Sequence, residues 1–277
     1  MRHVVSAMFL ASFPAVPALA EAHMDRGEYL VTTVMACGNC HSPMGPEGPI
    51  ADQALAGRLV EKNPAFTAIA PNITPAGRVS DWSDEELARA IREGLRPDGT
   101  VIGPPMPIPL YRHIADDDLS AIVAYLRSVP AVENDPGTSE YNIPLPPAYG
   151  PPVESVSAPE PGSTVEYGEY VARLAHCMEC HSPMTPQGPD LGENMGRGGF
   201  EFHGPWGTSV AANLTNHAEG LADYSDDEIK TMITKGMRPD GERMMPPMPF
   251  GYLAGMTDQD LDALVVYLRS LPGKPDM

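Results

Sequence analysis

The sequence predicts an all-α protein in which two tandem copies of one domain are joined by a proline-rich linker. Three observations support this prediction. Short motifs recur in the same order about 141 residues apart, each copy holds three helical segments with one apolar face, and proline is dense between the copies. We place the first domain at 21–133, the linker at 134–163 and the second domain at 164–277. No convincing alternating strand pattern separates the helical segments, which favours the all-α class.

The internal repeat consists of short motifs that keep their order and nearly their spacing. Because this order is preserved over the whole length of each copy, the chain uses one domain twice. The recurring pairs are Gly27-Glu28-Tyr29 with Gly168-Glu169-Tyr170, His41–Met44 with His181–Met184, Asn72-Ile73-Thr74 with Asn213-Leu214-Thr215, Arg96–Gly99 with Arg238–Gly241, Pro104–Pro107 with Pro246–Pro249, and Tyr125–Ser128 with Tyr267–Ser270.

The first two helical segments of each copy have recognisable ends. In the first copy, apolar residues along one helical face lead directly to Cys37. The second segment begins at a capping box, Ser83–Glu86 or Ser225–Glu228. It stops at Gly94 or Gly236, because glycine suits the left-handed residue that ends many helices.

The third segment and the linker complete each copy. Apolar residues at helical spacing run through Leu119–Leu126 and Leu261–Leu268, and each segment ends before a proline. The linker is rich in proline, glycine, serine and acids, so we expect it to be extended or polyproline-like. Its apolar side chains favour packing against one of the domains; these are Tyr141, Ile143, Leu145 and Tyr149.

The N-terminus has the features of an export signal. A short basic start is followed by an apolar stretch from Val4 to Val16 and by a small-residue site at Ala18-Leu19-Ala20. We expect cleavage after Ala20 and a periplasmic protein. An uncleaved membrane anchor is disfavoured because the stretch is too short to span a bilayer and contains Pro14. No later segment has the length and polarity of a transmembrane helix, so none is expected after cleavage.

The charge of the chain limits its partners. Its 18 basic and 37 acidic side chains give a formal net charge of −19. This argues against a nucleic-acid role, because phosphate binding needs positive charge. It suits docking on the basic surface of a protein partner, where long-range attraction speeds encounter.

The most specific feature of the chain is a pair of cysteine motifs, Cys37-Gly-Asn-Cys40-His41 and Cys177-Met-Glu-Cys180-His181. Two thiols separated by two residues can attach to one porphyrin, and the following imidazole can ligate its iron, so each motif predicts a covalently attached haem c. Two disulfides, a thioredoxin-like pair and a zinc site are alternatives. No βαβ pattern supports the thioredoxin reading, and zinc would not need the trailing histidines.

The second axial ligands are predicted to be Met106 and Met248. Each lies between prolines, which stiffen the strap that would hold a weak thioether, and each is far enough from His41 or His181 for the chain to reach the opposite haem face. Met44 and Met184 also recur but follow the histidines too closely to pass around a porphyrin. The other rival ligands do not recur; they are His113, His203 and His217.

Further polar and aromatic residues are candidates for contacts with the haem or its propionates, which need donors when partly buried. Turn formation and ordinary core packing explain the same residues as well. The candidates are Asn72, Trp82, Arg96, Trp206, Asn213 and Arg238.

Several motifs together resemble the class I cytochrome c domains in the cytochrome subunits of bacterial alcohol, gluconate and aldehyde dehydrogenases, and of some molybdenum hydroxylases. The resemblance covers about 24–272 and departs where Ala212–Thr215 and Tyr224 replace the PNIT sequence and the tryptophan of the first copy. The motifs are Pro71–Thr74, Trp82–Glu86, Ala90–Gly94, Arg96–Gly99, Met106-Pro107 and Ala124–Ser128.

The resemblance implies an electron-transfer protein rather than an enzyme, with a dehydrogenase as donor and an oxidase or another cytochrome as acceptor. Those subunits usually carry three haem domains, whereas the sequence predicts two. A dihaem enzyme of the peroxidase or thiosulfate-oxidising type is the alternative, and it would need one open or differently ligated iron. A haem-based sensor is a third hypothesis, but no segment resembles an output domain.

Overall fold

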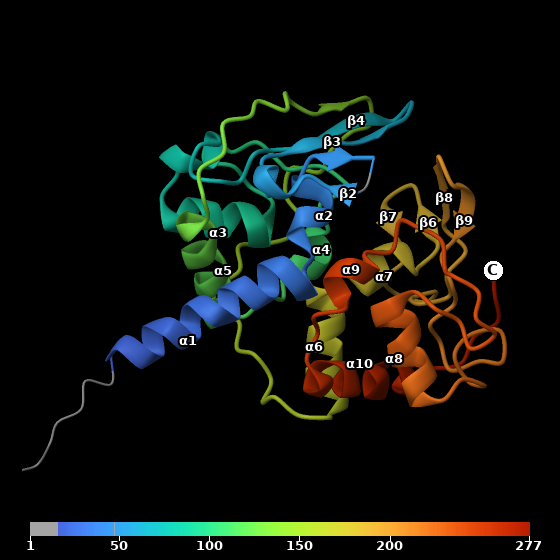
Figure 1. The fold of residues 1–277 in the computed structure, drawn as a ribbon. Coiled ribbons are helices and arrows are strands. Elements are labelled where there is room, and N and C mark those ends of the chain that lie inside the picture. The colour runs from blue at the N-terminus through green and yellow to red at the C-terminus, as the bar shows by residue number, and fades with distance from the viewer. Residues whose placement is uncertain (1–15, 47) are drawn as a thin grey trace, which may run out of the picture.

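The computed structural model describes residues 16–46 and 48–277, and it forms two lobes that correspond to the two sequence repeats (Figure 1). Most of the predicted signal peptide lies outside the described residues. The first described helix, α1 (Val16–Tyr29), continues into a π-helical turn over Leu30–Val34. Its C-terminal end leads into the first cysteine motif, as the sequence predicts.

Among its described residues, the first repeat contains four further helices and two strand pairs. The helices are α2 (Cys37–His41), α3 (Asp84–Glu93), α4 (Ile108–Tyr111) and α5 (Asp116–Ser128), with short 3-10 turns at Ala51–Gln53 and Arg78–Asp81. The strands are β1 (Met44–Gly45), β2 (Gly48–Pro49), β3 (Arg58–Lys62) and β4 (Phe66–Ala70). A fifth strand, β5 (Glu140–Tyr141), comes from the linker and pairs with β4 in an antiparallel sheet of order β3-β4-β5.

The second repeat has the same order of elements. Its helices are α6 (Val165–Leu174), α7 (Cys177–Cys180), α8 (Asp226–Lys235), α9 (Phe250–Leu253) and α10 (Asp258–Ser270). Its strands form two antiparallel pairs, β6 (Met184–Thr185) with β7 (Gly188–Pro189), and β8 (Glu201–Gly204) with β9 (Gly207–Val210).

The all-α prediction is therefore wrong, because both repeats mix helices with small antiparallel sheets. The sequence pattern does not reveal the strands, since each is short and, apart from Ala68 and Ala70 of β4, few of their side chains are buried. Leu59 of β3 is 50% exposed and Val210 of β9 is 59% exposed. Backbone pairing rather than apolar alternation holds these strands, and β5 joins its sheet from about 70 residues away along the chain.

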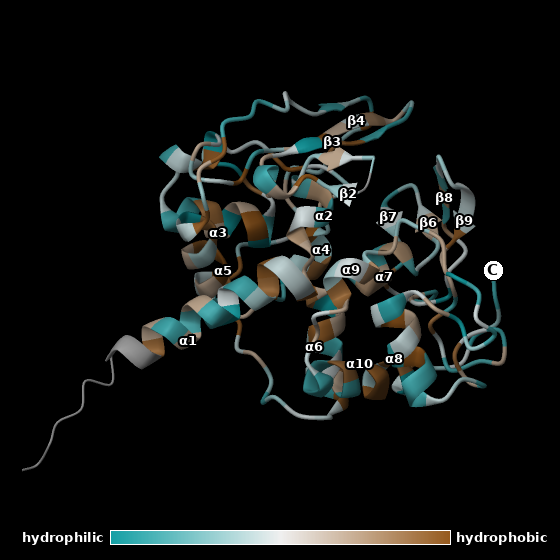
Figure 2. Cartoon of the chain, viewed as in Figure 1, coloured by the Kyte–Doolittle hydropathy of each residue, from teal (hydrophilic) through white to brown (hydrophobic). Residues whose placement is uncertain are grey.

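The first and third long helices cross closely in each repeat. A Cβ atom added to Gly27 of α1 would lie 2.1 Å from the carbonyl oxygen of Ala121 in α5. The equivalent atom on Gly168 of α6 would lie 1.9 Å from that of Ala263 in α10. Glycine thus recurs here because the helix backbones touch. In Figure 2, brown and teal segments alternate along α1, α6 and α10, so each of these helices has both apolar and polar residues.

The helix ends form as their sequences predict. Ser83 and Glu86 make a complete capping box at α3, and Ser225 and Glu228 make the same box at α8. An arginine from α5 or α10 also donates hydrogen bonds to the loop that precedes α3 or α8. Arg127 donates to the carbonyls of Val79 and Trp82, and Arg269 donates to those of Leu221 and Tyr224.

The two repeats pack through reciprocal tyrosine–aspartate hydrogen bonds. Tyr29 of the first repeat donates to Asp260 of the second at 2.6 Å, and its equivalent Tyr170 donates back to Asp118 at 2.7 Å. Each hydroxyl also accepts a backbone N–H from the opposite repeat at 3.1 Å. Because equivalent residues exchange equivalent bonds, the interface has an approximate two-fold relation.

The linker runs over the first repeat. The hydroxyl of Tyr141 donates to the carbonyl of Pro104 at 2.8 Å, and that of Tyr149 donates to the carbonyl of Ile102 at 2.9 Å. The expected packing against one domain is therefore confirmed for these two tyrosines, whereas Ile143 is exposed.

Candidate functional site

The two cysteine motifs occupy equivalent short helices, α2 and α7. Each helix is preceded by a residue in the left-handed conformation, Ala36 with φ of 47° and His176 with φ of 43°. This turn ends the preceding helix and starts the short one, so that both cysteines lie in the short helix, with His41 at the end of α2 and His181 directly after α7. All four cysteines are free thiols, and burial raises the pKa of Cys37 and Cys177 to about 12.

The histidine of each motif is held by a backbone carbonyl. Nδ1 of His41 lies 2.8 Å from the carbonyl oxygen of Pro71, and Nδ1 of His181 lies 2.7 Å from that of Ala212. A carbonyl can only accept, so Nδ1 carries the proton and the lone pair of Nε2 is free. Burial lowers the pKa of both imidazoles, which favours the neutral form that a metal needs.

The residues present therefore fit a covalently bound haem. Each motif offers two unpaired thiols and one neutral imidazole whose tautomer leaves Nε2 as a ligand atom. A further side chain near the first motif fits the same group. Nε of Arg58 is buried and has no hydrogen-bond partner in the described chain, which is the condition of a donor left for a bound anion such as a propionate.

Met106 and Met248 both lie in the loop just before a short helix. Each is partly buried and packs against the hydrophobic core, and its carbonyl accepts from the backbone N–H two residues later. The rival methionines differ, since Met44 is 47% exposed and Met184 is 46% exposed. Ligation by Met106 and Met248 stays a prediction.

The rival histidines lie in other environments. His113 is exposed at the end of the turn that follows α4. His203 pairs with Thr208 across the β8–β9 hairpin, and His217 accepts from the backbone N–H of Glu219.

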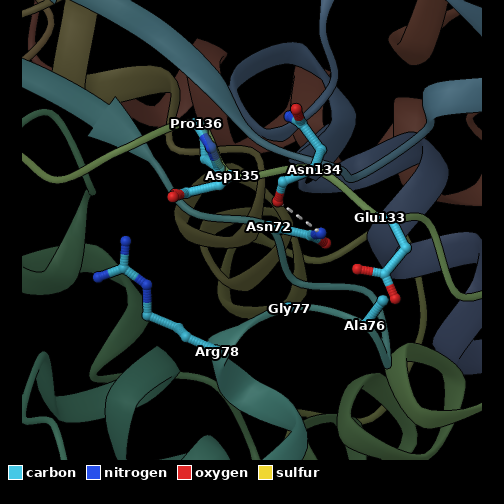
Figure 3. Close-up of a pocket in the computed structure, with 8 residues that line it drawn as sticks. All are labelled: Asn72, Ala76, Gly77, Arg78, Glu133, Asn134, Asp135 and Pro136. Atoms are coloured by element: carbon cyan, nitrogen blue, oxygen red, sulfur yellow. Dashed lines mark hydrogen bonds between the residues drawn. The ribbon is translucent and has the colours of Figure 1, made fainter.

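The two asparagines proposed as haem contacts have partners within the chain. The side chain of Asn72 donates to the carbonyls of Val132 and Asn134 and accepts from Thr74. Figure 3 shows it among the residues of a polar depression that also holds Arg78, and none of the cysteines, histidines or methionines of the predicted haem sites lines that depression. Asn213 repeats the arrangement with Thr215 and the carbonyl of Lys274. These loop contacts account for the recurrence of both amides.

The other four predicted contacts are placed differently in the two repeats. Arg96 donates to the carbonyl of Val101 at 2.8 Å, whereas its equivalent Arg238 lies beside the start of α8. Trp82 packs against the core, whereas Trp206 is 39% exposed at the β8–β9 turn, next to Gly204. The tryptophans are thus not equivalent, and their contact with haem stays a prediction.

The two cysteine motifs meet at the interface between the repeats. Burial is the main cause that raises the pKa of Cys180 to about 12, and the negative charges of Glu179 and of Cys40, from the other repeat, raise it further. The ring of Tyr111, at the end of α4, lies 6.2 Å from the ring of His176, the residue just before the second motif. The side chain of Tyr252, in α9 of the second repeat, approaches Gly38 in the first motif.

Sequence reasoning missed two groups at these sites. Arg58 has no counterpart among the recurring motifs, because the equivalent position in the second repeat is Gly199. Glu179 lies inside the second motif, where the first has Asn39, and its buried Oε2 has no hydrogen-bond partner in the described chain. Comparing the repeats for differences, rather than for matches, would have found both.

Comparison with known families gives a match for the second repeat. Residues 165–272, which make up most of the second repeat, match the model of the cytochrome c family. The first repeat carries the same cysteine motif, helix order and imidazole–carbonyl bond.

Most of the chain also resembles named cytochrome subunits. It is 30% identical to the cytochrome c subunit of a quinone alcohol dehydrogenase from Gluconobacter oxydans, over 92% of this chain and 56% of that subunit. It is 27% identical to the fructose dehydrogenase cytochrome subunit of Gluconobacter japonicus, over 95% and 56%. A dihaem cytochrome c-type protein of Cereibacter sphaeroides is 26% identical over 85% of this chain and 82% of the relative. The chain thus spans about half the length of the dehydrogenase subunits.

None of the helices within 16–46 and 48–277 has the length and apolar run needed to cross a bilayer.

Proposed function

We propose that the chain is a periplasmic dihaem cytochrome c that carries electrons between a dehydrogenase and a respiratory acceptor, as a shuttle or as a cytochrome subunit. The observation that carries this proposal is the pair of equivalent motifs in which a backbone carbonyl fixes the histidine tautomer beside two free thiols. Bound haem c would supply one-electron exchange at an iron held by the protein.

The residues have separate tasks in this proposal. Cys37 with Cys40, and Cys177 with Cys180, would anchor one porphyrin each through thioether bonds. The carbonyls of Pro71 and Ala212 hold the imidazole rings in place, and a backbone carbonyl does so equally well from proline or alanine. The change from PNIT to ANLT in the second repeat therefore preserves this support.

The second axial position would be filled by Met106 and Met248. A thioether on the iron raises the reduction potential relative to a second nitrogen ligand and leaves no open coordination site. This is why we favour electron transfer over a peroxidase-type reaction. The names of the relatives support a dehydrogenase as donor.

The export signal predicted over 1–20 supports the periplasmic location, since c-type haem is attached outside the cytoplasm. The net charge of −19 supports docking on a basic partner surface, and such docking should weaken as salt screens the attraction.

The test is to purify the exported protein and measure haem and iron per chain, together with the absorption spectrum and the binding of CO or cyanide. We expect two haems per chain, a low-spin spectrum with methionine ligation, and slow or no binding of either ligand. One haem per chain, or rapid ligand binding to one native centre, would contradict the proposal.

A further inference from the structure

The two cysteine motifs lie in similar folds but differ in the charges placed next to them. The backbone N–H of Gly57 donates to the carbonyl of His41 at 2.6 Å, and that of Gly198 donates to the carbonyl of His181 at 2.8 Å. This shared bond aligns the next residue of each repeat, so Arg58 is equivalent to Gly199. A guanidinium therefore stands in the first repeat where the second has no side chain.

Arg58 is tied to the first motif. Its Nη2 donates to the carbonyl of Asn39 at 2.7 Å, inside the motif itself. Burial is the main cause that raises the pKa of Cys40 and lowers that of His41, and the positive charge of Arg58 opposes the first shift and adds to the second. An arginine keeps its charge in any protein environment, so the contribution is permanent.

The second motif carries an acid instead. Glu179 takes the place of Asn39, and its carboxyl group is mostly buried, with Oε2 unpartnered in the described chain. In the described residues, no basic side chain contributes to the pKa of Cys180 or His181. The two sites thus differ by a fixed cation on one side and by an acid on the other.

These charges have a definite effect on redox chemistry. Oxidation of a haem adds one positive charge, so a nearby cation disfavours the oxidised form and a nearby carboxylate favours it. If the Glu179 carboxyl is neutral, Arg58 alone decides which haem has the higher reduction potential. If the carboxyl is ionised, the difference between the two potentials becomes larger. The direction is the same in both cases.

We infer that the first repeat holds the more easily reduced haem, because Arg58 lies at its attachment motif whereas the second repeat has Gly199 and the buried acid Glu179. The inference rests on the proposed function and adds the direction of electron transfer between the two haems. An electron supplied to the chain would come to rest in the first repeat, so the donor's side of the relay is the second repeat.

The experiment is a potentiometric titration of the haem-loaded full chain and its variants. We expect two midpoint potentials. Arg58→Gln should make reduction of the first repeat's haem about tenfold less favourable, which for one electron lowers the higher midpoint potential by about 59 mV. The lower midpoint potential should stay nearly unchanged. Arg58→Lys keeps the positive charge, so its higher midpoint potential should stay near that of the unaltered protein.

Two more variants complete the design. Arg89→Gln removes the same charge from an exposed position on α3 and should shift neither potential appreciably. Asn39→Asp places an acid in the first motif at the position of Glu179 and should also lower the higher potential. It tests the inference even if Arg58→Gln fails to fold or to bind haem.

The inference is overturned if Arg58→Gln or Asn39→Asp shifts the lower potential instead, or if Arg58→Gln shifts neither more than Arg89→Gln does. These results are distinct from a failure of the proposed function. That failure would appear as fewer than two haems, or as an open iron, in the unaltered chain.

Discussion

The two repeats share their helical cores and differ at their edges. In the first repeat, the β3–β4 hairpin gains β5 from the linker, and the loop of Asn72 is tied to the backbone of 132–134. In the second, the β8–β9 hairpin stays two-stranded, and the loop of Asn213 is tied to the C-terminal segment at Lys274. The segments that follow α5 and α10 thus hold the equivalent asparagine loops of the two repeats, and the sheets are where the repeats differ.

This comparison separates what the cofactor requires from what it leaves free. The close helix crossing, the left-handed turn before each motif and the imidazole–carbonyl bond occur twice. The third strand β5, the exposed Trp206 and the charged groups near the motifs do not. The parts that differ are the ones available to distinguish two electron-transfer centres and their partners.

Removal of the cysteines should have the largest effect and tests whether the two motifs are equivalent. Replacing both Cys37 and Cys40 by alanine should reduce haem from two to one per chain, and so should the same change at Cys177 and Cys180. The measurement is haem per chain by absorbance of the denatured protein. Loss of both haems from one double variant only would show that one site depends on the other.

Replacement of the methionines asks whether the axial ligands are also equivalent. Met106→Ala and Met248→Ala should each open one iron to CO and abolish the methionine-linked absorption of one centre. Met44→Ala and Met184→Ala are matched controls, because both side chains are about half exposed. An unchanged spectrum in Met106→Ala or Met248→Ala would disprove that assignment.

The helix crossings are expected to be the most sensitive positions of the fold. Gly27→Ala and Gly168→Ala each place a Cβ about 2 Å from a carbonyl oxygen of the crossing helix, so each should cost about 1–3 kcal/mol or more of unfolding free energy. Gly251→Ala is the control, since a Cβ added there meets nothing within 4 Å. Denaturant unfolding measures all three, and equal stability for Gly168→Ala and Gly251→Ala would refute the crossing.

The smallest expected effect concerns the interface at alkaline pH. Burial, together with the hydrogen bond to Asp260, raises the pKa of Tyr29 to about 12 from its ordinary value of 10. The native state therefore holds this proton more tightly than the unfolded chain. Its stabilisation is present below pH 10 and is lost as pH rises toward 12. Tyr29→Phe should flatten this part of the stability curve, and an identical pH dependence in both proteins would contradict the assignment.

The sequence predicted the repeated motifs well, because each is local. The CxxCH motifs, the capping boxes at Ser83 and Ser225, and the terminating glycines at Gly94 and Gly236 all depend on residues within one or two turns. The sheets were missed for the opposite reason. Their strands are short and contain few buried apolar side chains, and β5 reaches β4 only after the chain has passed through α3, α4 and α5.

The sequence by itself determined that one domain occurs twice and that each copy presents two thiols and an imidazole in one turn, since covalent spacing along a helix fixes this. Only the tertiary structure decided which carbonyl holds each imidazole, that the two motifs meet at the interface, and that Arg58 and Glu179 lie beside them. Hydrogen bonds and charges act through space between residues that are distant in the chain, so they follow from packing and not from local pattern.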